Sequence, residues 1–107
     1  MEYGLLGEKL GHSYSKEIHE QLADYTYDLC PVSREDFDAF MTKHDFKAIN
    51  VTIPYKQDVI PYLDAMDDNA ASIGAVNTIV NKNGRLEGHN TDFSGFLYMI
   101  EIGRAHV

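Results

Sequence analysis

The sequence predicts a single α/β domain, with a largely parallel mixed sheet flanked by helices and an antiparallel hairpin at its edge. Short alternating apolar segments, typical of strands, are separated by segments whose apolar residues recur at helical spacing. Asn83 and Gly84 form a dipeptide typical of tight hairpin turns, with a strand-like segment on each side. A chain of 107 residues with 44% hydrophobic residues is long and apolar enough for one hydrophobic core.

The first half of the chain is predicted to alternate between strands and helices. Ser15 and Ser33 each precede a segment with helical spacing, so both are expected to be helix N-caps. Pro31 lies in a predicted strand, which indicates that this strand is at a sheet edge or is ending. The expected elements are a strand at 2–6, a helix at 16–25, a strand at 27–32, a helix that begins after Ser33, and a strand at 47–53.

The second half is predicted to contain helices and the hairpin. Pro54 suits the first turn of a short helix, and Gly74 suits the end of the next one. The second of these helices is expected to bury Ala65, Met66, Ala70 and Ile73. The expected elements are a short helix from Pro54, a helix at 64–73, strands at 75–81 and 85–89, and a helix that begins at Thr91 or Asp92.

Composition excludes several classes of function. The net charge of -8 argues against a nucleic-acid surface, which needs clustered Lys and Arg. No apolar run approaches the length of roughly 20 residues that spans a bilayer, and the acidic Glu2 does not fit a signal peptide. Cys30 is the only cysteine, so neither an intrachain disulfide nor a Cys-based zinc site is possible. We therefore expect a cytoplasmic protein that binds neither nucleic acid nor membrane.

The last residues do not resemble a natural domain end. The segment IGRAHV back-translates to a sequence similar to a common sequencing adapter. We therefore expect one domain over 1–101, followed by an artefactual or truncated tail at 102–107.

Four polar clusters interrupt the apolar pattern where strands or loops meet helices, which is where open α/β sheets bind ligands. In the first cluster, GHSYS, Ser13 and Ser15 lie just before a predicted helix, where hydroxyls and backbone N–H groups can bind a small carboxylate. The alternative is that Ser15 is only an N-cap and Ser13 a turn residue.

The second cluster is NVTIPYK. Asn50 and Thr52 have the same parity in the predicted strand, so both are expected on one face. Lys56 follows closely and can donate hydrogen bonds to substrate oxygens or exchange a proton. Its alternative role is that of a solvated surface lysine.

The third and fourth clusters are GAVNT and GHNTD. Asn77 and Thr78 are either ligand-binding residues or ordinary residues of the hairpin. Asp92 is either a carboxylate that pairs with Lys56 and accepts from a substrate hydroxyl, or the N-cap of the last helix. The chain contains no G-x-G-x-x-G, and therefore no dinucleotide fingerprint.

Taken together, four motifs resemble the N-terminal, substrate-binding domain of the shikimate dehydrogenase family. They are GEKLGHSYSKEIH, NVTIPYK, IGAVNT and GHNTDFSG, in the family's order and spacing, and the resemblance covers residues 3 to 101. One departure is Lys16, where many members have proline. The resemblance implies reversible, NADP-dependent reduction of 3-dehydroshikimate to shikimate, a step toward chorismate and the aromatic amino acids.

The resemblance also implies roles for individual residues. Ser13 and Ser15 would hold the substrate carboxylate, and Lys56 and Asp92 would form the catalytic pair. The ring hydroxyls would be held by Thr52, Asn77 and Asp92, with Asn50 supporting the site. NADP would be bound by a second, Rossmann-fold domain that is absent here, so the fragment alone is not expected to catalyse the reaction.

Two other functions remain open at this point. A quinate/shikimate dehydrogenase would differ in the pocket around the ring, and a shikimate-sensing domain would use the same pocket for binding only. The expected partner is in every case a small molecule, shikimate or 3-dehydroshikimate. Both a monomer and a homodimer are compatible with the resemblance, because an open sheet edge can pair with a second copy.

Overall fold

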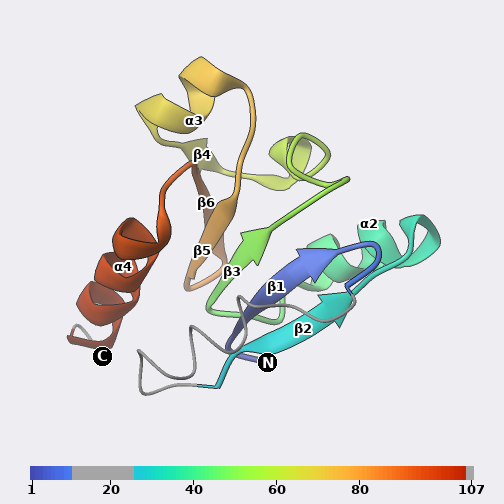
Figure 1. Cartoon of the computed structure of the whole chain (residues 1–107), viewed down its shortest axis with the longest axis horizontal. Coiled ribbons are helices and arrows are strands. Elements are labelled where there is room, and N and C mark those ends of the chain that lie inside the picture. The colour runs from blue at the N-terminus through green and yellow to red at the C-terminus, as the bar shows by residue number, and fades with distance from the viewer. Residues whose placement is uncertain (11–25, 106–107) are drawn as a thin grey trace.

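A computed structural model describes residues 1–10 and 26–105 of the chain, and its centre is a six-stranded sheet (Figure 1). The strand order across the sheet is β2-β1-β3-β5-β6-β4. The strands are β1 (Tyr3–Gly7), β2 (Asp28–Pro31), β3 (Ala48–Val51), β4 (Ala65–Met66), β5 (Thr78–Lys82) and β6 (Arg85–His89).

The sheet is mixed, as the sequence predicts. β1 pairs in parallel with β2 and β3, and β4 pairs in parallel with β6. The antiparallel pairs are β3 with β5 and the β5–β6 hairpin. Asn83 and Gly84 connect the hairpin with φ values of 55° and 94°, the left-handed conformation that a two-residue turn of this type requires. The α/β fold class is thereby confirmed, with the short β4 lying beyond the hairpin.

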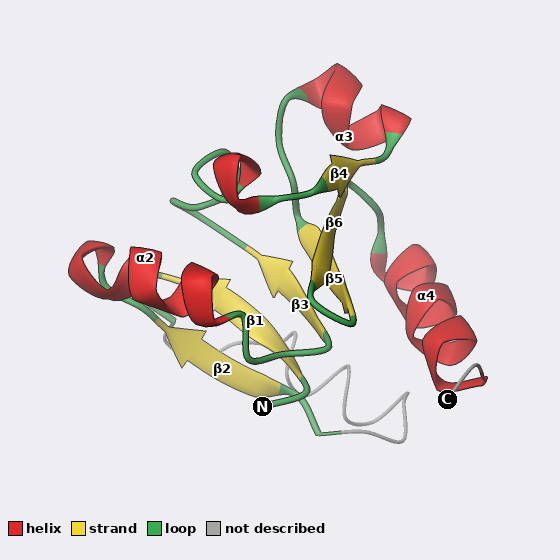
Figure 2. Ribbon diagram, turned by 180° about the vertical axis from the view of Figure 1, so that it is seen from behind, coloured by secondary structure: helices red, strands yellow, loops and turns green. Residues whose placement is uncertain are grey.

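Helices cover both faces of the sheet (Figure 2). They are α2 (Arg34–Lys43), α3 (Asp68–Ile73) and α4 (Phe93–Ala105), with a short 3₁₀ helix, η1 (Ile60–Tyr62). Phe37 and Met41 of α2 and Ala70 of α3 pack with Leu6 and Ile49 in one core cluster. The other face carries a second cluster, formed by Tyr3, Leu5, Tyr27, Ala48, and Phe96 and Ile100 of α4.

The ends of two helices follow their local sequence. Ser33 caps α2 by accepting a hydrogen bond from the Asp36 N–H, as predicted. Asp67 caps α3 in the same way through the Ala70 N–H, and Gly74 ends that helix with a φ of 76°. Pro31 is the last residue of β2, which lies at the sheet edge, so both expectations for this proline hold.

Of the two helices predicted between residues 54 and 73, the first is wrong and the second is confirmed only in its C-terminal part. Instead of a helix from Pro54, the chain forms turns after a cis Ile53–Pro54 peptide bond, followed by η1. The predicted helix at 64–73 begins only at Asp68, because Ala65 and Met66 pair with β6. Ile73 is 58% exposed rather than buried. The strand expected at 47–53 ends at Val51.

No helix in the described part of the chain has the length and apolar composition of a membrane span. α4 continues to Ala105, beyond the domain boundary expected at residue 101, and that boundary stays a prediction.

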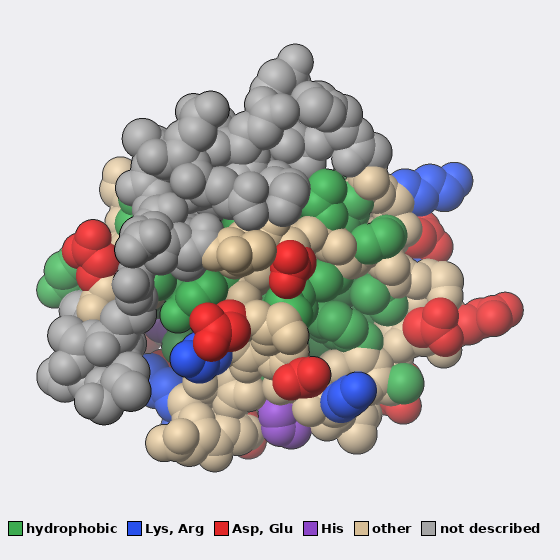
Figure 3. Space-filling model, turned by 90° about the horizontal axis from the view of Figure 1, so that it is seen from below, with side chains coloured by type: hydrophobic (Ala, Val, Ile, Leu, Met, Phe, Trp, Pro, Cys, Tyr) green, Lys and Arg blue, Asp and Glu red, His purple; other side chains and the backbone are tan. Residues whose placement is uncertain are grey.

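On the face shown in Figure 3, acidic side chains are spread among a few Lys and Arg side chains.

Candidate functional site

The strand register brings three of the four polar clusters to one end of the sheet. Asn50 near the end of β3 is opposite Thr78 at the start of β5, and Thr78 is opposite His89 at the end of β6. These strand ends lie side by side. Thr52 follows the end of β3, Asn77 precedes the start of β5, and Asp92 comes shortly after the end of β6. Ser13 and Ser15 of the first cluster lie outside the described residues.

Lys56 lies in the loop that follows β3, and its side chain is exposed. The Val76 N–H donates to the Lys56 carbonyl at 2.8 Å, which ties the loop to the segment before β5. Among the described residues, no ion pair or side-chain hydrogen bond involves the Lys56 ammonium group. This geometry is compatible with both a ligand-binding lysine and a solvated surface lysine, so the role of Lys56 toward a ligand stays a prediction.

Thr52 is the first residue after β3 and is half-buried. Its N–H donates to the Leu6 carbonyl at 2.9 Å, and its own carbonyl accepts from the Tyr55 N–H at 3.0 Å. A Cβ on Gly7 would lie only 2.7 Å from the Thr52 Cγ2, so β1 approaches this side chain closely because residue 7 is glycine. The backbone position of Thr52 is therefore fixed by the adjacent strand and turn.

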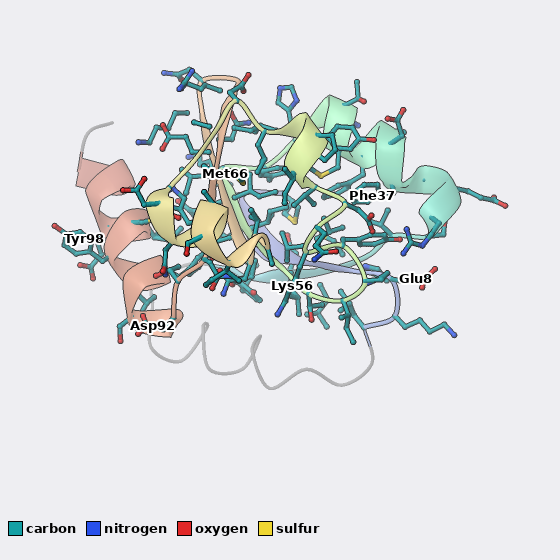
Figure 4. The ribbon with its side chains drawn as sticks, turned by 90° about the horizontal axis from the view of Figure 1, so that it is seen from above. Glu8, Phe37, Lys56, Met66, Asp92 and Tyr98 are labelled. Atoms are coloured by element: carbon teal, nitrogen blue, oxygen red, sulfur yellow. The ribbon has the colours of Figure 1, made fainter. Side chains whose placement is uncertain are left out.

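Asp92 is the N-cap of α4, as one of its two predicted roles requires. Its Oδ1 accepts a hydrogen bond from the Gly95 N–H at 2.8 Å, while the residue as a whole is exposed. The predicted pairing with Lys56 is not present in this structure, because no ion pair of 4.0 Å or less joins them within the described residues. Figure 4 shows the two side chains along the same edge of the molecule, apart from each other.

Asn77 connects β5 to the loop that carries Asp92. Its Nδ2 donates to the Thr91 carbonyl at 2.9 Å, and its Oδ1 accepts from the Thr91 N–H at 3.0 Å. The same Oδ1 accepts from the Thr78 hydroxyl at 3.1 Å. Asn77 thus fixes the residue that immediately precedes Asp92, and one N–H of its amide has no further partner among the described contacts.

The Asn50 side chain is held by Tyr27, which immediately precedes β2, and by Thr78 of the neighbouring strand β5. Its Oδ1 accepts from the Tyr27 hydroxyl at 2.7 Å, and its Nδ2 donates to the Thr78 Oγ1 at 3.2 Å. This geometry fits the supporting role expected for Asn50. The sequence interpretation missed Tyr27, although a tyrosine in an apolar strand usually has a partner for its hydroxyl when it is buried.

Residues 75–77 connect the two loops that carry the charged groups. Besides the contact of Val76 with Lys56, the Asn77 carbonyl accepts from the Val51 N–H at 2.8 Å, and the Asn77 N–H donates to the His89 carbonyl at 3.0 Å. Val76 is fully buried. Hydrogen bonds to the one segment 75–77 therefore hold the backbones of the two loops relative to each other.

Further polar contacts stabilise the surroundings of these loops. The Asn90 Nδ2 donates to the Ala75 carbonyl at 3.0 Å. His89 Nδ1 lies 2.9 Å from an oxygen of Asp67, the residue that caps α3. The buried side-chain N and O atoms among the described residues all have hydrogen-bond partners. Such satisfied networks keep loops in one conformation.

Three groups outside this cluster have raised pKa values, and the hydrogen bond to Asp38 is the main cause of the raised pKa of the Tyr62 phenol. Burial, with a smaller contribution from Asp28, raises the pKa of the half-buried Cys30 thiol. Burial also raises the pKa of the Tyr55 phenol, whose hydroxyl donates to the Val32 carbonyl at 2.6 Å. None of these residues contributes to the candidate site, and Cys30 is not expected to be a reactive thiol.

The described residues fit neither a metal centre nor a dinucleotide site. No three His, Cys, Asp or Glu side chains come together in a metal-binding arrangement in this part of the chain. A Rossmann-type site needs a glycine-rich turn between a strand and a helix. Among the described residues, the β2–α2 connection (32–33) and the β6–α4 connection (90–92) contain no glycine.

The arrangement suits a small ligand with several oxygen atoms. Lys56, the Thr52 hydroxyl and the Asn77 amide supply donors, and Asp92 supplies a carboxylate acceptor. A few well-placed polar groups on rigid elements are typical of sites that orient a small molecule.

Comparison with known proteins gives a consistent family. A family model described as the shikimate dehydrogenase substrate binding domain matches residues 5–79. The shikimate dehydrogenase (NADP(+)) of Clostridium beijerinckii is 46% identical over 102 residues, which cover 88% of this chain and 38% of that protein. The chain therefore spans well under half the length of this curated relative.

Solved structures show the same similarity. Shikimate 5-dehydrogenase from Thermus thermophilus in complex with shikimate matches with a TM-score of 0.77 and 32% identity, covering 96% of this chain and 42% of that one. The ligand-free 5-ketofructose reductase of a Gluconobacter strain matches with a TM-score of 0.74 and 26% identity, covering 94% and 39%.

Proposed function

The chain belongs to the shikimate dehydrogenase substrate-binding domain family, and from this membership we propose that it binds shikimate and 3-dehydroshikimate. The complete enzyme would interconvert these two compounds with NADP(H). The observation that carries the proposal is that Lys56, Asn77 and Asp92 are brought to one end of the sheet and tied together through residues 75–77.

In this proposal each side chain has a distinct task. Lys56 and Asp92 act at the hydroxyl that becomes a ketone, where the ammonium group donates a proton or orients the oxygen. Thr52 and Asn77 bind ring hydroxyls, and Asn50 supports them. Ser13 and Ser15 hold the carboxylate. The exposed position of Lys56 and its lack of a described ion-pair partner support its availability to substrate.

In this proposal NADP is not bound by the described residues of this chain, whose β2–α2 and β6–α4 connections contain no glycine. We assign its binding to the part of the relatives that lies beyond the match with this chain. The 107-residue chain alone is then expected to bind shikimate weakly and to show no dehydrogenase activity.

A second candidate is reduction of a different polyhydroxylated ketone. It is favoured by the similarity to 5-ketofructose reductase, whose fold matches over nearly the whole chain. Shikimate is a ring carboxylate, whereas 5-ketofructose is a sugar ketone. The two candidates therefore differ in whether the ligand needs a carboxylate-binding group.

Amide NMR of the 107-residue chain tests the proposal. We expect millimolar shikimate to shift the amide signals next to Thr52, Lys56, Asn77 and Asp92, with smaller shifts for quinate and none for 5-ketofructose. Signals of the hairpin turn at Asn83 and Gly84, at the other end of β5 and β6, serve as the internal control. Shifts with 5-ketofructose but not with shikimate would favour the second candidate, and no shifts with any ligand would contradict a binding role of the isolated domain.

We further propose a cytoplasmic protein without nucleic-acid or membrane partners, which the net charge of -8 supports. A homodimer through the edge strand β2 is compatible with the sheet order, since β2 is outermost among the described strands. Analytical ultracentrifugation over a concentration series distinguishes a monomer from such a dimer.

A further inference from the structure

A continuous chain of hydrogen bonds crosses the sheet beneath the candidate site. It begins at the Tyr27 hydroxyl, which donates to the Asn50 Oδ1 at 2.7 Å. The Asn50 Nδ2 donates to the Thr78 Oγ1 at 3.2 Å, and the Thr78 hydroxyl donates to the Asn77 Oδ1 at 3.1 Å. It ends at Thr91, whose N–H and carbonyl both bond to the Asn77 amide.

Two members of this chain, Tyr27 and Thr78, are shielded from water, whereas Asn50 and Asn77 are half-buried. Tyr27 and Thr78 are both 0% exposed, and Asn50 is directly opposite Thr78 in the β3–β5 pair. Buried polar groups that lose a partner are left unsatisfied, because water does not reach them to replace it. Each link therefore restricts the orientation of the next one.

The donors in the chain all point in one direction. Because Tyr27 donates to the Asn50 oxygen, the Asn50 NH₂ group must face Thr78. The Thr78 hydroxyl accepts that bond and directs its own hydrogen to Asn77. The Asn77 oxygen is then occupied by two donors, and one N–H of the amide donates to the Thr91 carbonyl, so only the second N–H remains for a ligand.

We propose that Tyr27 is a positioning residue that acts through Asn50 and Thr78 to present the Asn77 amide to substrate as a hydrogen-bond donor. Asn77 would thus bind a substrate oxygen by donation and would not accept from a hydroxyl. The same contacts fix the backbone of Thr91, next to Asp92. The part that concerns substrate rests on the proposed binding of shikimate.

The first test needs no ligand. Tyr27→Phe removes one hydroxyl and keeps the apolar ring, and Tyr62→Phe is the matched control, because its hydroxyl donates to Asp38 and has no link to Asn77. In Tyr27→Phe we expect the Thr91 amide to exchange with solvent at least about tenfold faster and the Asn77 side-chain NH₂ signals to shift. Tyr62→Phe should change neither. Unchanged exchange and unchanged signals in Tyr27→Phe would overturn the proposal.

The second test uses shikimate affinity in a double-mutant cycle. Tyr27→Phe should weaken binding roughly three- to tenfold, as loss of one neutral hydrogen bond does, yet have no further effect in an Asn77→Ala background. Additive losses would refute action through Asn77. If the unaltered chain does not bind shikimate, the proposed function is contradicted. The hydrogen-exchange test would still decide whether Tyr27 acts on Asn77 through Asn50 and Thr78. Thr78→Val breaks the same chain one link further on, and provides the comparison if Tyr27→Phe does not fold.

Discussion

The two roles of Asp92 can be separated by two substitutions. As the N-cap of α4, Asp92 needs only an acceptor oxygen for the Gly95 N–H, which asparagine also provides. As a functional carboxylate it needs a negative charge, which asparagine lacks. Asp92→Asn therefore keeps the cap and removes the charge, whereas Asp92→Ala removes both.

The structure sets the expected magnitudes. Asp92 is exposed, so water can reach the Gly95 N–H, and Asp92→Ala should cost about 1 kcal/mol of unfolding free energy, within the usual range for caps. This corresponds to a fall in Tm of about 4–8 °C for a domain of this size. Asp92→Asn loses only a screened interaction with the helix dipole, which we expect to cost about 0.3 kcal/mol.

Thermal denaturation and shikimate titration of the same samples provide the assay. Both variants should lose shikimate affinity, by about tenfold, because hydrogen bonds to charged groups are stronger than neutral ones. If Asp92→Asn is as unstable as Asp92→Ala, the capping geometry is wrong. If Asp92→Asn binds shikimate as well as the unaltered chain does, the carboxylate has only a capping role.

Three further predictions concern the rest of the molecule. Lys56→Ala should leave the unfolding free energy within about 0.5 kcal/mol, as should the exposed control Lys43→Ala, because neither side chain is buried. In a chimeric enzyme in which this chain replaces the matching domain of the C. beijerinckii enzyme, only Lys56→Ala should depress turnover. Equal turnover of the Lys56→Ala and Lys43→Ala chimeras would contradict a catalytic role of Lys56. Gly7→Ala should cost about 1–3 kcal/mol, because the added Cβ lies 2.7 Å from the Thr52 Cγ2, and chemical denaturation showing no loss would disprove this close approach. The pKa of Tyr55 is raised above 10.0 in the folded state, so the contribution of this group to stability should be constant below that pH and fall above it, where the unfolded chain ionises first. Denaturation between about pH 9 and about pH 11 should show a smaller fall for Tyr55→Phe, and an equal fall would refute this assignment.

Elements governed by local chemistry were predictable from the sequence. The hairpin turn at Asn83 and Gly84 and the cap at Ser33 depend on residues within a few positions of one another, and both are confirmed. The segment Ala65–Met66 was predicted as helix because its spacing fits a helical face. In the structure it pairs with 87–88, and such non-local pairing cannot be read from local periodicity.

The candidate site divides in the same way. Polar residues at strand ends indicated where Thr52, Asn77 and Asp92 would gather, and the register places them at one end of the sheet. The contacts of Tyr27 and Asn77 could not be predicted, because they join residues 14 or more positions apart. Their roles toward a ligand stay predictions.

The separation of Lys56 and Asp92 is itself informative. A preformed ion pair between them would compete with a ligand for both charges. Here both side chains are exposed, so each charge stays hydrated at little cost until a ligand arrives. The backbone hydrogen bond from Val76 to Lys56, and the hydrogen bonds between the Asn77 side-chain amide and the Thr91 backbone, hold the two loops in place without such a pair. A ligand with oxygen atoms between the two loops would then contact both charges without first breaking an ion pair, which is the preorganisation that a binding site needs.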